Sequence, residues 1–256
     1  MALSASTVWE IRVDGSDNNG GGFVSGGSGT DRSQQTAAHA TLSASSTVHT
    51  TTTQINVAAG DYTVTAADVD NTLQITGGTA TAGFYRITAS DIPNNRWTVD
   101  RSAGTAGQTV VGAMGGGLAS PGKVAGAVVA GNIVWQRYSV TTYDISSATA
   151  NISGGRVNIA VAGIRWEGYE STRGDLSTSV PRIRSLVAST TMFSTASGTG
   201  IFGNFILDAA GQATIICMAT GAGTTTHRVK AISGTSGSGS FSCGSGSVLL
   251  LCSVQG

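Results

Sequence analysis

Three short apolar stretches decide the predicted fold: Phe205-Ile206-Leu207-Asp208-Ala209, His227-Arg228-Val229-Lys230-Ala231 and Val248-Leu249-Leu250-Leu251-Cys252. The second begins 22 residues after the first, and the third begins 21 residues after the second. A period of this length is typical of proteins built from stacked repeats, in which each repeat contacts only its neighbours. The alignment therefore predicts parallel strands that lie one above another.

The aligned stretches also predict which side chains are buried. In this register Leu207, Val229 and Leu250 fall into one column that faces inward. Side chains alternate across a strand, so Asp208 and Lys230 are expected on the outer face. A chain that advances by one strand spacing per turn and buries like columns inside is a right-handed parallel β-helix, which is the expected fold of this part.

The N-terminal part shows no such period, but it contains shorter strand signals. Thr72–Ile75, Phe84–Ile87 and Asn95–Val99 are rich in residues that favour strands, and Asp91–Asn95 has the composition of a turn. These segments predict a small antiparallel unit. The whole chain is therefore expected to be all-β.

A change of composition marks the expected domain boundary. The segment Gly115–Gly122 is rich in glycine, and an apolar stretch follows it. We expect a small N-terminal β domain over residues 1–123, which attaches the protein to a larger particle, and the β-helix over residues 124–256.

Overall composition excludes several classes of protein. Only 11% of the residues are charged and the formal net charge is +0, so no basic surface is expected to bind nucleic acid. The first residues lack the pattern of a secretory signal, and no apolar segment is long enough to cross a bilayer. We therefore expect synthesis in a host cytoplasm without membrane insertion. The 3 cysteines lack metal-ligand spacing and are expected to be buried thiols.

Seven segments in both parts of the chain share the pattern of one known family. They are Val8–Arg12, Gly15–Phe23, Gly29–Gln35, Asp68–Gly78, Gly83–Ile87, Trp97–Arg101 and Trp166–Asp175. In these segments the chain resembles the β-helix-repeat proteins that tailed phages and prophage-like regions encode, and the matching motifs are turns rather than a catalytic signature. This resemblance implies a virion protein, such as a tail spike, a tail fibre or a head-decorating protein, and trimers are common in that class.

The densest group of carboxylates gives weak catalytic candidates. Glycosidases place two carboxylates on either side of one sugar bond, and Glu167, Glu170 and Asp175 are the candidates for such a role. Arg165 and Arg173 lie close to them in sequence, so a local network of ion pairs is the favoured interpretation. We therefore assign no catalytic pair.

Aromatic residues give equally weak candidates for ligand binding. Tyr143, Trp166 and Tyr169 are of the type that stacks on sugar rings, but residues of this type also fill cores and interfaces. None of the 3 histidines has a second histidine or a cysteine at ligand spacing, so we expect neither a metal site nor a cofactor.

The expected function is that of a structural or host-contacting virion component without enzymatic activity. Its expected partners are two further copies in a homotrimer and other virion proteins, with host-surface carbohydrate as a further candidate. Two alternatives stay open. A carbohydrate-active β-helix that cuts host polysaccharide needs more acidic residues than this chain has on its repeats. A secreted adhesin or filament subunit needs an export signal.

Overall fold

A computed structural model describes residues 3–151, 156–188, 191–210, 212, 216–232 and 241–255. The chain forms two compact units. One comprises Met1–Glu10 and Asp14–Leu118, and the other comprises Ile11–Val13 and Ala119–Gly256.

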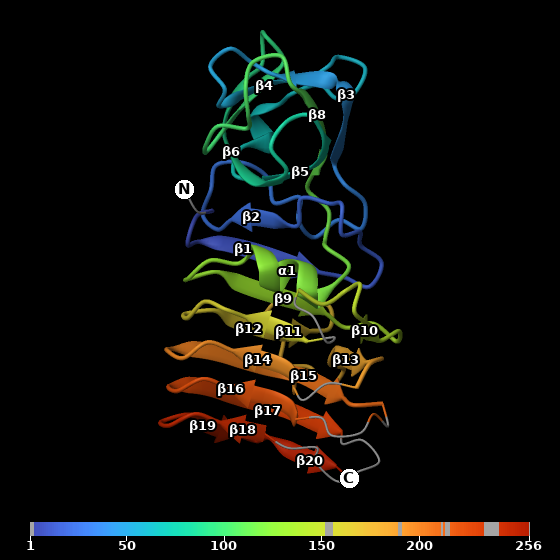
Figure 1. The fold of residues 1–256 in the computed structure, drawn as a ribbon, viewed down its shortest axis with the longest axis vertical. Coiled ribbons are helices and arrows are strands. Elements are labelled where there is room, and N and C mark those ends of the chain that lie inside the picture. Colours follow the sequence, from blue (N-terminus) through green and yellow to red (C-terminus); the bar gives the residue numbers. More distant parts are fainter. Residues whose placement is uncertain are drawn as a thin grey trace. The chain divides into compact units, whose positions relative to one another are not determined.

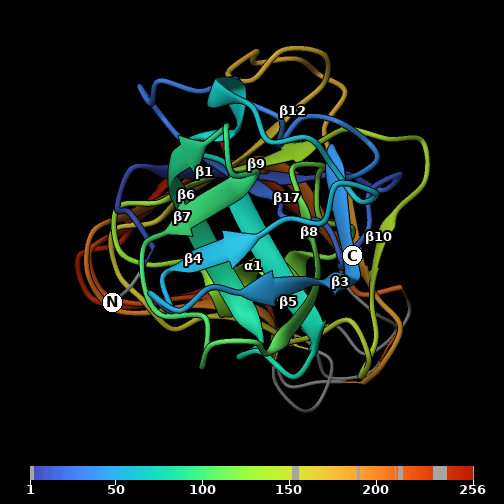
Figure 2. The ribbon, with the colours of Figure 1, turned by 90° about the horizontal axis from the view of Figure 1, so that it is seen from above.

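Six strands of the first unit form a closed barrel in the order β3-β4-β7-β6-β5-β8 (Figures 1 and 2). All neighbouring strands in it are antiparallel. The register of three pairs shifts at a bulge, and such bulges help a sheet to curve and close. A closed barrel leaves no unpaired edge. The strands are β3 (Ala40–Val48), β4 (Gln54–Asn56), β5 (Thr72–Gly78), β6 (Gly83–Asp91), β7 (Arg96–Val99) and β8 (Thr109–Met114).

A buried carboxylate holds the interior of the barrel together. Asp68 ends the short 3-10 helix η1 (Ala66–Asp68) and is fully buried. Its oxygens accept hydrogen bonds from Trp97 Nε1 at 3.0 Å and from the hydroxyl of Tyr62 at 2.8 Å. Burial, together with the hydrogen bond to Asp68, raises the pKa of Tyr62 to about 12. The phenol therefore stays neutral and keeps donating its proton to the carboxylate.

The three strand segments predicted in this unit are confirmed as parts of β5, β6 and β7, except that Asn95 lies in the turn before β7. They also pair with one another as antiparallel neighbours. Closure of the barrel by β3, β4 and β8 was not predicted. Outside the barrel, β1 (Thr7–Ile11) and β2 (Gly22–Val24) pair with each other in the antiparallel direction.

The second unit contains parallel strands and one short helix. One set of parallel strands is connected in the order β10-β13-β15-β12-β9, and β17 pairs with β15, β19 and β20. A separate four-stranded sheet has the order β11-β14-β16-β18. Ser120 caps α1 (Pro121–Ala127) by accepting a hydrogen bond from the backbone N–H of Lys123. The strands are β9 (Ile133–Arg137), β10 (Tyr143–Ile145), β11 (Val157–Ile159), β12 (Arg165–Tyr169), β13 (Arg182–Ser185), β14 (Thr191–Thr195), β15 (Gly200–Asp208), β16 (Ile216–Thr220), β17 (Thr224–Ile232), β18 (Phe241–Cys243), β19 (Val248–Leu250) and β20 (Ser253–Gln255).

The expected fold class, a small β domain followed by a right-handed parallel β-helix, is wrong. The chain is all-β as expected, but it contains a closed antiparallel barrel of six strands and mixed sheets. The parallel strands also differ from a simple repeat of one strand per turn. β15 pairs with β12 along its first half and with β13 along its second half, while β17 pairs with both β19 and β20.

The register expected from the aligned stretches is wrong by two residues. Leu207 lies opposite Ala231 instead of Val229, and Phe205 lies opposite Val229. The true separation between paired residues is therefore 24 residues at this pair of strands. A two-residue error moves no side chain to the other face, because the side-chain period of a strand is two.

The predicted burial is consequently right for some positions and wrong for others. Leu207 and Val229 are buried as expected, whereas Leu250 is 51% exposed. Asp208 was expected on an open outer face, but it is only 4% exposed because the guanidinium of Arg182 covers and pairs with its carboxylate at 2.5 Å. Lys230 is partly exposed.

One backbone feature explains how β15 and β17 each pair with two successive strands. Asn204 in β15 and Arg228 in β17 have φ values of 61° and 50°, and Leu251, which follows β19, has φ of 54°. Gly203 pairs with His227, and Phe205 pairs with Val229. Asn204 and Arg228 lie between these pairs, so the two residues with positive φ occupy the same position in neighbouring strands. Positive φ turns the strand direction within one residue.

The cysteines follow the expectation only in part. Cys217 is buried, and this burial raises the pKa of its thiol to about 11. Cys243 is exposed and Cys252 is partly exposed, so the expectation of three buried thiols is wrong for these two. A thiol with such a high pKa is almost wholly protonated at neutral pH and reacts slowly with oxidants. We therefore expect Cys217 to react slowly while the protein is folded.

The positive φ at Leu251 yields a prediction about stability. Left-handed backbone costs a residue with a branched, bulky side chain about 1–2 kcal/mol, whereas asparagine tolerates it. Leu251 is 86% exposed, so its side chain contributes little burial. We expect Leu251→Asn to increase the free energy of unfolding by about 1 kcal/mol, as measured by chemical denaturation. Leu250→Asn is the control, because Leu250 lacks a positive φ, and a gain of the same size there would contradict the explanation.

Candidate functional site

The first catalytic candidate, Glu167, lies on β12 in the middle of the parallel strands. Its side chain is 5% exposed, and its Oε1 accepts a hydrogen bond at 2.8 Å from Nε of Arg165. Arg165 also lies over the ring of Trp135, at 5.4 Å from the ring centroid. A nearly buried carboxylate is costly unless it is paired, and Arg165 supplies the pairing charge. The local ion pair favoured from sequence is therefore present at Glu167.

A histidine that the sequence analysis did not connect with this carboxylate also reaches it. Nε2 of His227 lies 3.5 Å from Oε1 of Glu167. Glu167 is opposite Gly203, and Gly203 is in turn opposite His227, so the imidazole spans the intervening strand. A Cβ atom on Gly203 would lie only 2.3 Å from Nε2 of His227. The contact therefore requires glycine at position 203.

Glu170 and Asp175 organise the loop that follows β12. The hydroxyl of Ser177 donates a hydrogen bond to Oε2 of Glu170. The carboxylate of Asp175 accepts backbone N–H groups of Glu170 at 2.9 Å, Ser171 at 2.8 Å and Thr172 at 2.9 Å. Partial burial by itself raises the pKa of Asp175, but these hydrogen bonds outweigh it and lower the pKa to about 2.

The three carboxylates are thus engaged in structural contacts. Among the described residues, Glu167 pairs with Arg165 and His227, whereas Glu170 and Asp175 bond to groups of their own loop. No two of the three share a partner in these contacts. These contacts stabilise a strand and a loop, and the assignment of no catalytic pair stays a prediction.

The aromatic candidates cannot stack on a ligand in this structure. Tyr143 is 2% exposed, Trp166 is fully buried and Tyr169 is 1% exposed. Trp166 donates its Nε1 proton to Oε1 of Gln136 at 3.0 Å, and its ring packs edge-on against Phe193. All three rings are core residues in this structure, which is the alternative that the sequence left open beside ligand binding.

Comparison with known proteins gives no relative. No family model matches the chain, and no curated protein or solved structure is similar to it. Among the described residues there is also no group of three or more His, Cys, Asp or Glu side chains placed to hold a metal ion.

The contact between His227 and Glu167 can be tested through the glycine between them. Gly203→Ala forces the imidazole away from the carboxylate, and we expect a loss of about 1–2 kcal/mol in the free energy of unfolding. His227→Ala removes the clash, so the double variant should be more stable than the sum of the single effects predicts. Additive effects in urea unfolding would show that the ring does not occupy this position.

Asp175 yields a prediction about pH. Its pKa is about 2 in the folded protein against an ordinary value of 3.8, so its stabilising effect is complete above pH 3.8 and is lost as the pH falls toward 2. We expect Asp175→Asn to lower stability at neutral pH and to flatten the fall of stability over that interval. Urea unfolding at a series of pH values measures both effects. An unchanged profile would mean that the carboxylate does not organise the loop.

Proposed function

We propose that the protein is a non-enzymatic structural component of a bacteriophage particle and that it works in contact with further copies of itself. One observation carries the self-association. The neighbouring strands β19 and β20 form an apolar strip that is 43–52% exposed at each position. The strip consists of Val248, Leu249, Leu250 and Val254.

Exposed apolar side chains that lie together are unfavourable in water, and such patches commonly mark interaction surfaces. β19 and β20 both pair with β17, and side chains alternate across a strand, so this edge presents apolar side chains on both faces. Leu249 and Val254 lie opposite the buried residues Thr226 and Ala231, whereas Val248 and Leu250 lie opposite Thr225 and His227. An exposed strand also offers backbone donors and acceptors to a partner strand. Association would remove both the apolar surface and the unpaired backbone groups from water.

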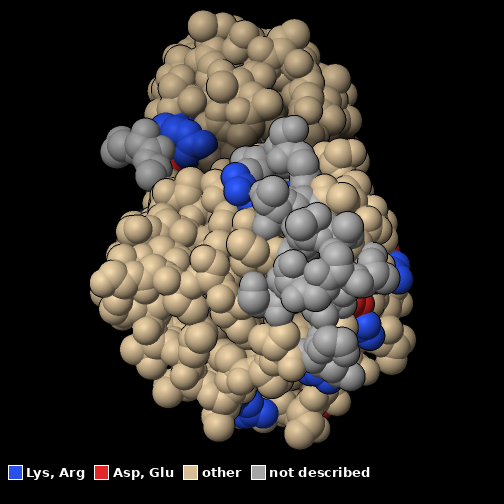
Figure 3. Space-filling view, turned by 60° about the horizontal axis from the view of Figure 1, so that its bottom comes forward, with Lys and Arg blue, Asp and Glu red and all other residues tan. Residues whose placement is uncertain are grey.

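A second copy of this chain is the occupant that we propose for the strip. The formal net charge is +0, so identical copies do not repel one another over long distances. Figure 3 shows that most of the described surface on one face carries neither a positive nor a negative side chain. The number of copies, three, and the further virion partners are part of the proposal only because the resemblance to phage proteins implies them.

The absence of enzymatic activity is proposed because the acidic candidates already have structural partners. Glu167 is held by an arginine and a histidine, and Asp175 by three backbone N–H groups. The virion setting is supported by the resemblance of the sequence motifs to phage proteins. In the described part of the chain, no helix combines the length and the apolar character needed to cross a membrane.

The test is the oligomeric state of the purified chain. We expect light scattering to report an oligomer at micromolar concentration, and Leu250→Glu to shift it toward the monomer because a charge cannot be buried unpaired in the interface. Val140→Glu is the matched control, since Val140 is an exposed apolar residue outside the strip. Antibodies against the chain should also label intact particles in electron micrographs.

Two results would contradict the proposal. A wild-type chain that remains monomeric would show that the apolar strip does not bind a second copy. Dissociation by Val140→Glu to the same extent as by Leu250→Glu would show that the strip is not the interface.

A further inference from the structure

A titratable side chain, His227, lies beside the apolar strip. It pairs in register with Leu250, and Thr225 pairs with Val248. Side chains alternate across a strand, and residues that pair in register share a face of the sheet, so His227 lies on the same face as Val248 and Leu250. A partner that covers these two apolar side chains therefore also covers the imidazole.

The imidazole has little contact with water before any partner arrives. Its side chain is 21% exposed, and its Nε2 lies 3.5 Å from Oε1 of Glu167. One row across β12, β15, β17 and β19 consists of Glu167, Gly203, His227 and Leu250. His227 thus lies between a nearly buried carboxylate and a half-exposed leucine of the strip.

The net charge of this part of the sheet depends on the protonation of His227. Glu167 already has a counter-ion, because Nε of Arg165 lies 2.8 Å from its Oε1. Arg165 contributes +1 and Glu167 contributes −1, so the three side chains together are neutral while the imidazole is neutral and carry +1 when it is protonated. Histidine is the side chain whose charge ordinarily changes between about pH 8 and pH 5.

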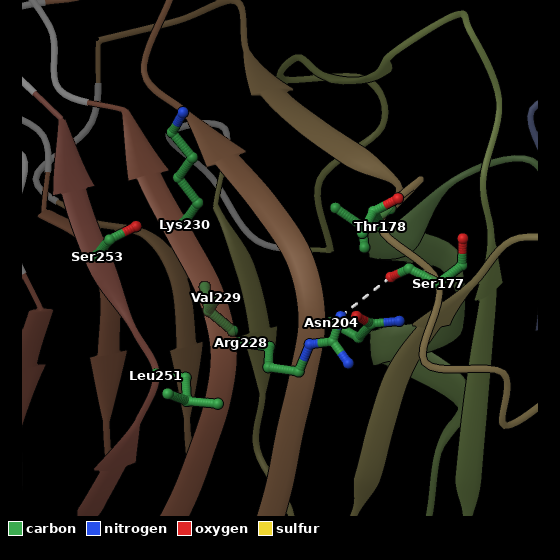
Figure 4. A pocket seen from close by; sticks show the side chains of 9 residues that line it. Ser177, Thr178, Asn204, Arg228, Val229, Lys230, Leu251 and Ser253 are labelled. Carbon is green, nitrogen blue, oxygen red and sulfur yellow. Dashed lines mark hydrogen bonds between the residues drawn. The ribbon is translucent and has the colours of Figure 1, made fainter.

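The other charged residues of β17 do not oppose this change. Arg228 directs its guanidinium toward the loop after β12, where Nη2 donates a hydrogen bond to the carbonyl oxygen of Ser177 at 3.2 Å (Figure 4). The side chain of Lys230 extends away from Arg228. Arginine and lysine ordinarily keep their positive charge over this pH range, so they add no negative charge that could balance an imidazolium.

The carboxylates on the neighbouring elements, Glu167 apart, are also engaged elsewhere. Glu170 accepts the hydroxyl of Ser177, and Asp175 accepts three backbone N–H groups of its own loop. On β15 the carboxylate of Asp208 pairs with Arg182, and β19 contains no charged residue. Glu167 is therefore the acidic group that faces the imidazole.

Association acts differently on the two protonation states of His227. The attraction between the imidazolium and Glu167 already exists in the free chain, so it gives the oligomer no new contact. A second copy over the strip removes the remaining water from the imidazole, and loss of water disfavours the charged form. A neutral imidazole can be covered at little cost, whereas a protonated one must lose its proton or keep the partner away.

We propose that His227 makes the self-association pH-dependent, so that copies associate while the imidazole is neutral and separate when acidification protonates it. This regulation rests on the self-association proposed above. The free chain then binds more protons than the associated chain. By linkage, the affinity is greatest above the range in which the imidazole titrates and falls as the pH decreases through that range.

The experiment is sedimentation velocity of the full chain at pH 7.5, 6.5 and 5.5. Each copy releases at most one proton on associating, so the association constant should fall by up to about tenfold per copy for each unit of pH. His227→Gln is neutral at every pH and should stay associated at pH 5.5. His227→Lys is charged at every pH and should associate at pH 7.5 as weakly as the wild type does at pH 5.5.

His49→Gln is the matched control, because His49 lies in the first unit, and it should keep the pH dependence of the wild type. Circular dichroism at each pH confirms that every variant is folded. The proposal is overturned if His227→Gln still dissociates on acidification, if His227→Lys associates as tightly as the wild type at pH 7.5, or if His49→Gln abolishes the pH dependence. A wild-type oligomer that is equally stable at pH 7.5 and 5.5 contradicts the regulation alone, whereas a wild-type monomer at every pH contradicts the self-association as well.

Discussion

The second unit depends on a backbone constraint that recurs in neighbouring strands. At Asn204 and Arg228, and again at Leu251, the chain adopts the left-handed conformation that L-residues normally avoid. Each of these residues lets one segment turn and continue against a different partner strand. Gly168 lies beside the first of them, where a Cβ atom would come within 1.9 Å of the carbonyl oxygen of Asn204. Pairing of β12 with β15 near Asn204 thus needs a glycine at position 168 and a left-handed backbone at Asn204.

The same constraint explains which features could be predicted from the sequence. Alternation of apolar residues located the strands around Leu207 and Val229 and predicted correctly that these two side chains face inward. A register error of two residues leaves every side chain on the same face of the sheet. The bends at Arg228 and Leu251 carry no glycine or asparagine to mark them. The local sequence pattern therefore predicted strands here. It could not predict that β15 and β17 each pair with two successive strands along one edge.

The candidate site shows a similar division. The ion pair between Arg165 and Glu167 follows from two residues close in sequence, and it was anticipated. The contact with His227 depends on the true pairing of three strands across Gly203, so no local motif could reveal it. Burial of Tyr143 and Trp166 likewise depends on the packing of distant segments. Side chains that act through tertiary packing were thus the ones misjudged.

The closed barrel of the first unit has a consequence for the order in which the protein folds. Its closing pair joins Ala40 in β3 to Met114 in β8, across most of that unit. Bringing such distant segments together costs chain entropy before any contact repays it. During synthesis the edge of β3 that pairs with β8 stays unpaired until β8 has been synthesised. An unpaired strand edge favours aggregation, so we expect the risk to be greatest in that interval rather than in the finished barrel.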